Sequence, residues 1–110
     1  KGNVKNPNFE GDVTVSFDIS YVKDGKKIAR TARASLYKPA YLAEEGGKVV
    51  VEVRVNRNGS VVSAVVKKSS NSALNETARK AALNADTIFN IDPNAPVSNV
   101  GTITYTFVAQ

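Results

Sequence analysis

The sequence predicts a two-layer α+β fold: an antiparallel sheet of three or four strands with one main helix packed on one face. Two patterns lead to this class. A β-branched hairpin pattern covers residues 47–70, and one helical pattern then separates it from a last strand at residues 101–110. An N-terminal strand or hairpin is expected to extend this ββαβ core. The 110 residues suit a single domain with a modest hydrophobic core.

The hairpin is the clearest element. Residues 49–56 alternate between valine and a mostly polar residue, so one face of this strand is apolar. Asn58-Gly59 supplies residues that tolerate the positive φ angles that a tight hairpin turn needs. Residues 61–66 are also rich in valine but do not alternate cleanly. A β-bulge near Val62–Ser63 would bring them back into phase.

The N-terminal third contains a second strand pattern. Residues 1–11 are polar and rich in turn-forming residues, which predicts a mobile lead-in or the end of a linker before a single domain at residues 12–110. A strand is predicted at residues 12–22, followed by a turn at Asp24-Gly25 and a return strand from Ile28 to about Leu36. Arg30 would share the apolar face of that return strand, and its alanines also suit a helix. The apolar face of the first strand consists of Val13, Val15, Phe17, Ile19 and Tyr21.

One main helix is expected after the hairpin. Pro39 favours an extended Lys38, and residues 42–45 leave room for only one helical turn. Asn71 or Ser72 is the predicted N-cap of the main helix. In the loop at residues 86–100, Ile88, Phe89 and Ile91 are expected to close one end of the sheet. The apolar stripe of the helix consists of Leu74, Ala78, Ala81, Ala82 and Ala85.

The last strand is predicted to pair with the first hairpin strand, which gives the order second hairpin strand, first hairpin strand, last strand. The last strand then lies at an edge unless the N-terminal strand covers it. It carries no charge, although edge strands usually carry lysine, proline or a bulge as protection. It is therefore either covered or available to pair with a partner. The expected core consists of Val51, Val53, Leu74, Ala78, Ile103, Tyr105 and Phe107.

The composition argues against several functions. The chain has no His and no Cys, which removes the usual catalytic triads and most zinc sites, and no nucleophile and base can be paired. We therefore expect no enzyme activity, no metal and no cofactor. The net charge of +5 suits acidic partners, but Lys and Arg are scattered among acids without interleaved aromatic residues. This distribution argues against nucleic-acid binding.

Several motifs occur in an order that resembles one family. Lys38-Pro39-Ala40-Tyr41 is similar to a Pro-x-Tyr motif, and residues 47–61 are similar to a Gly-x-Val-x-Val-x-Val-x-x-x-Gly-x-Val hairpin. Ser69-Ser70 precedes the helix, and residues 92–96 and 101–107 are similar to a loop and a closing strand. From Leu36 onwards the chain thus resembles the C-terminal domain of the TonB energy-transducer family, in its short Bacteroidetes-type form. Two departures are Leu42, where many members have a second proline, and an apparent insertion at residues 21–32.

The resemblance implies a non-enzymatic periplasmic domain, anchored in the inner membrane through an upstream segment. It implies binding of the TonB box of TonB-dependent outer-membrane transporters by β-strand addition, and force transfer from the ExbB–ExbD motor through upstream regions. The open alternatives are a periplasmic scaffolding module that binds peptidoglycan or a signalling partner, and a homodimer formed by strand exchange. The expected partner-binding edge is Thr102, Ile103, Thr104, Tyr105, Thr106, Phe107, Val108 and Ala109, with a second candidate segment at Lys38, Pro39, Ala40 and Tyr41.

Overall fold

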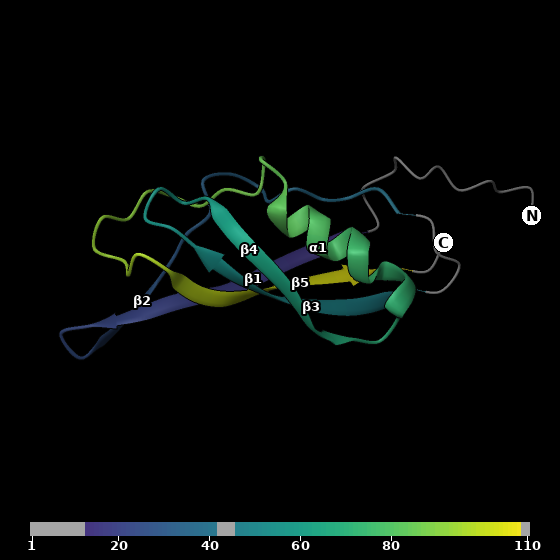
Figure 1. Cartoon of the computed structure of the whole chain (residues 1–110), viewed down its shortest axis with the longest axis horizontal. Coiled ribbons are helices and arrows are strands. Elements are labelled where there is room, and N and C mark those ends of the chain that lie inside the picture. Colours follow the sequence, from purple (N-terminus) through teal and green to yellow (C-terminus); the bar gives the residue numbers. More distant parts are fainter. Residues whose placement is uncertain (1–12, 42–45, 109–110) are drawn as a thin grey trace, which may run out of the picture.

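The computed structural model describes residues 13–41 and 46–108. Its five strands form one antiparallel sheet in the order β2-β1-β5-β3-β4, with one α-helix on one face (Figure 1). This confirms the α+β class, and the N-terminal hairpin joins the same sheet. The elements are β1 (Val13–Lys23), β2 (Lys26–Ala29), β3 (Gly47–Val55), β4 (Val61–Ser69), a 3₁₀ turn (Ser72–Leu74), α1 (Asn75–Leu83) and β5 (Asn99–Phe107).

The hydrophobic core lies on the face of the sheet that α1 covers. The helix packs over β4 and β3, and residues 30–41 cross over β1 and β5 on the same side (Figure 1). Tyr41 of this crossing segment packs edge-on against Phe107, with the ring centroids 4.8 Å apart. The expected core is confirmed, since each of its members is buried: Val51, Val53, Leu74, Ala78, Ile103, Tyr105 and Phe107.

The predicted hairpin is also confirmed in detail. Gly59 has φ +92°, and a Cβ atom built there would lie 1.9 Å from the Phe89 carbonyl oxygen. The register between β3 and β4 shifts between Arg54 and Val55, which leaves Val62 as the extra residue of the expected bulge. A second shift, between Val50 and Val51, makes Lys67 another extra residue. The predicted helix cap Asn71 caps the 3₁₀ turn by accepting a hydrogen bond from the Ala73 amide, whereas α1 itself begins after Leu74, which makes no side-chain cap.

Other local predictions need correction. The return strand β2 ends at Ala29 and does not reach Leu36, because Arg30 enters the protein interior and the chain then leaves the sheet. Ile91 does not close the sheet end, since its side chain is 71% exposed, whereas Phe89 is fully buried. Ala85 is exposed beyond the end of α1. The lead-in predicted at residues 1–11 and the turn predicted at residues 42–45 lie outside the described residues.

The Tyr105 hydroxyl should make stability depend on alkaline pH. It is buried and has no hydrogen-bond partner in the described part of the chain, and burial raises the pKa of Tyr105 far above its usual range. An unfolded tyrosine ionises near pH 10, so the contribution of Tyr105 is complete below about pH 10 and is lost as pH rises further. Tyr105→Phe should raise the free energy of unfolding at pH 7 by about 1 kcal/mol and flatten the alkaline decline.

The matched control is Tyr21→Phe. The Tyr21 hydroxyl donates a hydrogen bond to Asp92 Oδ2 at 2.8 Å, and this bond raises the pKa of Tyr21. Removing this hydroxyl should lower stability at pH 7. Urea unfolding across pH 7–11 would measure both variants, and a Tyr105→Phe protein that is less stable than Tyr21→Phe would contradict this account.

Candidate functional site: an open strand edge

β5 is a central strand, which overturns the expected edge at Thr102–Ala109. β1 pairs along one side of β5 from Val13↔Phe107 to Ile19↔Gly101, and β3 pairs along the other from Gly47↔Phe107 to Val55↔Asn99. Because backbone groups alternate in direction, the amides of the even-numbered threonines of β5 point towards β1 and those of Ile103 and Tyr105 towards β3. Neither side of β5 is open to a partner in this arrangement. Ala109 lies outside the described residues.

β1 is tightly integrated into the sheet. A Cβ atom built on Gly101 would lie 2.7 Å from the Ile19 Cα atom and 2.7 Å from the Asp18 carbonyl oxygen, so only glycine permits this close approach. Val13, Ile19 and Tyr21 of β1 are buried in the interior. Burial of three such side chains contributes about 5–9 kcal/mol, which is comparable with the total stability of many domains. A partner that replaced β1 would first have to expose them.

The open edge of the sheet is therefore on β1. β2 covers the outer side of β1 only from Ser20 to Lys23, and the Arg30 amide adds one bond to the Ile19 carbonyl. No strand in the described ranges pairs with the outer side of residues 13–18. The other two edges, on β2 and β4, are protected against pairing with another strand. β2 is only four residues long and has two lysines, and β4 has two bulges and the exposed Lys67 and Lys68.

The open stretch of β1 carries a defined set of backbone groups. The Ile19 carbonyl points outward, since it accepts the bond from Arg30, and main-chain direction repeats at every second residue. The N–H and C=O groups of Val15 and Phe17 therefore point outward as well, whereas those of Ser16 point towards Thr104 of β5. Neither Val15 nor Phe17 has a backbone partner on its outer side among the described residues. These groups can receive an extended main chain.

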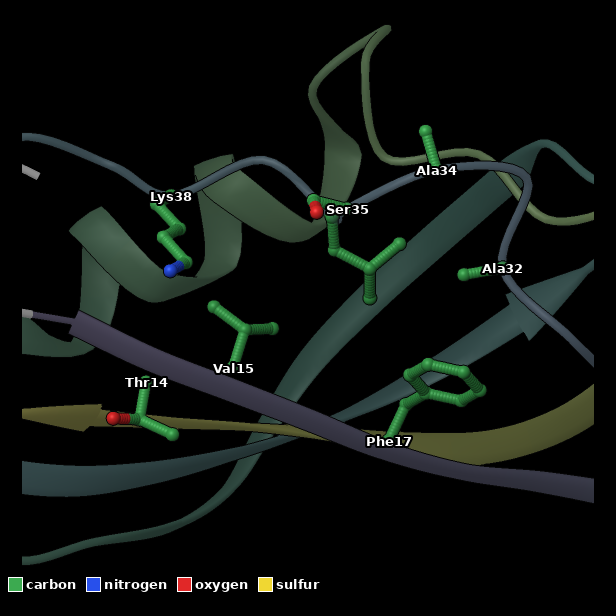
Figure 2. Close-up of a pocket in the computed structure, with 8 residues that line it drawn as sticks. Thr14, Val15, Phe17, Ala32, Ala34, Ser35 and Lys38 are labelled. Atoms are coloured by element: carbon green, nitrogen blue, oxygen red, sulfur yellow. The ribbon is translucent and has the colours of Figure 1, made fainter. Parts of the chain in front are cut away.

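A groove of about 310 Å³ lies beside this edge. In Figure 2, the side chains of Val15 and Phe17 rise from β1 towards the crossing segment, and the Lys38 ammonium group points back towards β1. Val15 and Phe17 are half-buried, and Lys38 is exposed. The Phe17 ring packs edge-on against Phe89 with the centroids 5.0 Å apart, which fixes the floor of the groove. The lining consists of Thr14, Val15, Phe17, Ala32, Ala34, Ser35, Leu36 and Lys38.

A buried polar network holds the start of the crossing segment, which is the far wall of the groove. Arg30 is 2% exposed, and its guanidinium donates hydrogen bonds to Asn99 Oδ1 and to the carbonyl oxygens of Asn56 and Asn90. Its Nε atom lies 4.0 Å from Asp92 Oδ2. A buried charge costs several kcal/mol unless it is paired and hydrogen-bonded, so these partners fix the position of Arg30. Arg30 thus determines where the chain leaves β2 and begins the wall.

The second predicted segment is divided between two environments. Lys38 lies at the groove. Pro39 and Ala40 line a separate hollow beside α1, where Pro39 is buried and Ala40 is exposed, and Tyr41 is buried against Phe107 of β5. The sequence analysis did not select Val15 and Phe17 as site residues, although it placed them on the apolar face of their strand. One signal could have located them: an isolated glycine inside a β-branched strand, here Gly101, indicates close approach of another backbone. Because β1 covers β5, the open edge of the sheet lies on β1 and not on β5.

The described residues contain no cluster of three or more side chains of the metal-ligating types. None of the helices in the described part of the chain has the length and apolar character needed to cross a membrane. The architecture and the open edge together define an α+β domain of the kind that can receive an extended segment of a partner.

Comparison with known proteins identifies the family. The model of the family described as Gram-negative bacterial TonB protein C-terminal matches residues 37–108, and the chain belongs to this family. Searches of curated proteins and of solved structures returned no significant match. The matched range contains β3, β4, α1 and β5, whereas β1 and β2 precede it. The strand that covers β5 is thus outside the family core.

Substitution of Gly101 tests how tightly β1 is held. Gly101→Ala should lower the free energy of unfolding by about 1–3 kcal/mol, because the new methyl group collides with the backbone of β1. Amide exchange should accelerate at Ser16 and Asp18 more than in the β3–β4 hairpin. A variant with unchanged stability and unchanged exchange at these amides would mean that β1 is not closely packed on β5.

Proposed function

We propose that this domain is the receiving domain of a TonB-type energy transducer. It binds the TonB box of outer-membrane transporters by β-strand addition and passes on force from the ExbB–ExbD motor. The observation that supports this most is an unprotected strand edge on a domain of the TonB C-terminal family. The proposal includes a periplasmic location and an inner-membrane anchor upstream of this chain.

Strand addition suits both the binding of a transporter segment and the transfer of mechanical force to it. Main-chain hydrogen bonds supply affinity with little demand on sequence, while pockets for alternate side chains add selectivity. One domain can therefore serve several transporters whose boxes differ. When two paired strands are pulled along their length, the hydrogen bonds between them share the load. An edge in the same sheet as the buried β5 and β3 would carry that load into the hydrophobic core.

A second candidate function is a periplasmic scaffolding module that binds peptidoglycan or a signalling partner. The observation that favours it is the covered side of β5, because the expected receptor edge is already occupied by β1. The net charge of +5 is compatible with both functions. The two candidates differ in the ligand that they bind, so one pair of binding measurements separates them.

Calorimetric titration should detect binding of synthetic TonB-box peptides from transporters of the same organism. If the peptide adds as a strand, N-methylation at every second residue should abolish binding, because it removes the amides that point towards the domain, whereas methylation at the residues between them should have a small effect. Equal sensitivity at all positions would contradict strand addition. Sedimentation with peptidoglycan in the absence of peptide binding would favour the scaffolding module.

A further inference from the structure

The main chain of β1 can accept an extended occupant along its outer side. Val15 and Phe17 present outward N–H and C=O groups that no described residue pairs. Another strand can pair with all four groups at once, because their spacing of two residues matches the repeat of a strand ladder. β2 already occupies the same side further along, at Ser20 to Lys23. An added segment would therefore continue the line of β2.

The groove determines which side chains such a segment needs on its inner face. Val15 and Phe17 form an apolar floor, and Leu36 of the crossing segment is buried beside them. In an added strand, every second side chain points to the same face as these residues. Apolar side chains at alternate positions would fill the groove, while the positions between them would face the solvent.

The charge of the groove adds a further requirement. Lys38 is the only charged residue of its lining, and no ion pair of Lys38 is present among the described residues. Its ammonium group points towards β1 near Thr14 and Val15 (Figure 2). An occupant that carries a carboxylate at this end of the groove would therefore gain a charged hydrogen bond.

We infer that the receiving edge of this domain is the outer side of β1 at residues 13–18, where the groove beneath residues 32–38 selects an extended acidic segment with alternating apolar side chains. This inference rests on the proposed function and names its site and the chemistry of its ligand. The receiving edge then lies one strand outward from β5, and binding leaves the contacts of β1 with β5 intact.

The probe is the capped peptide Glu-Ser-Val-Ser-Val-Ser-Glu, in which both Glu residues lie on the same face as the two Val residues, so that either strand direction places a carboxylate in the groove near Lys38. The control peptide has Gln in place of both Glu residues. Calorimetry should detect binding of the first peptide to the whole domain, and the control should bind about two- to fivefold more weakly, as for an exposed ion pair. With Lys38→Gln, the two peptides should bind equally.

Two proline variants test the edge itself. Val15→Pro removes an amide that has no described partner and should weaken peptide binding at least tenfold while the domain stays folded, as circular dichroism would show. Val15→Thr keeps both the amide and the side-chain shape and should bind nearly as the parent does. Ser16→Pro removes an amide that faces Thr104 and should unfold the domain.

If Val15→Pro fails to fold, hydrogen exchange on the parent protein decides the question, because the peptide should protect the amides of Val15 and Phe17. No binding of the probe, or binding without protection at these two amides, would overturn the inference. Loss of TonB-box binding in the calorimetric test above would overturn the proposed function separately, since the probe is not a transporter sequence.

Discussion

The structure depends on the pairing of β1 along β5. This contact closes the open side of a four-element family core, and it requires glycine at position 101, where the two backbones come closest. β1 brings Val13, Ile19 and Tyr21 into the hydrophobic core. The same pairing removes the free edge that β5 would otherwise present. A strand outside the family match thus contributes both to stability and to the location of any partner site.

The crossing segment at residues 30–41 has two roles that follow from this pairing. It covers the core face of β1 and β5 with Leu36 and Tyr41, and it forms one wall of the groove beside the open edge of β1. The buried Arg30 fixes its starting point through bonds to three residues that are distant in sequence. Because buried hydrogen bonds hold the start of this wall, an added strand would meet a preformed site. The groove is therefore a product of the same contacts that stabilise the fold.

Local signals in the sequence were sufficient for the elements themselves. The turn at Asn58-Gly59, the phase break near Val62 and the alternation in β1 follow from neighbouring residues, and each was predicted correctly. The place of β5 beside β3 was also predicted correctly, but the covering of its other side by β1 was left open, because that pairing joins residues more than 80 positions apart and no local pattern encodes it. The absence of charge along residues 102–108 was compatible with either a covered or a receiving strand. Gly101 was the residue that distinguished them.

The end of β2 illustrates the same limit. Arg30 looked like an interruption of an apolar face, but its partners Asn56, Asn90 and Asn99 lie in other parts of the chain, so its burial could not be inferred locally. The location of the groove depends in turn on where the crossing segment, residues 30–41, leaves the sheet. The sequence identified Lys38 as a candidate within a separate segment, but it could not show that Lys38 lies at a groove beside β1.

The most direct test of the account is an NMR measurement on the labelled domain with a bound peptide. The cross-strand amide contact between Ser16 and Thr104 reports whether β1 stays on β5, since these residues are paired partners. The account predicts that this contact persists and that new contacts to the peptide appear at the amides of Val15 and Phe17. Loss of the contact between Ser16 and Thr104, with peptide contacts at Thr104 instead, would show that the partner displaces β1 and would contradict the account.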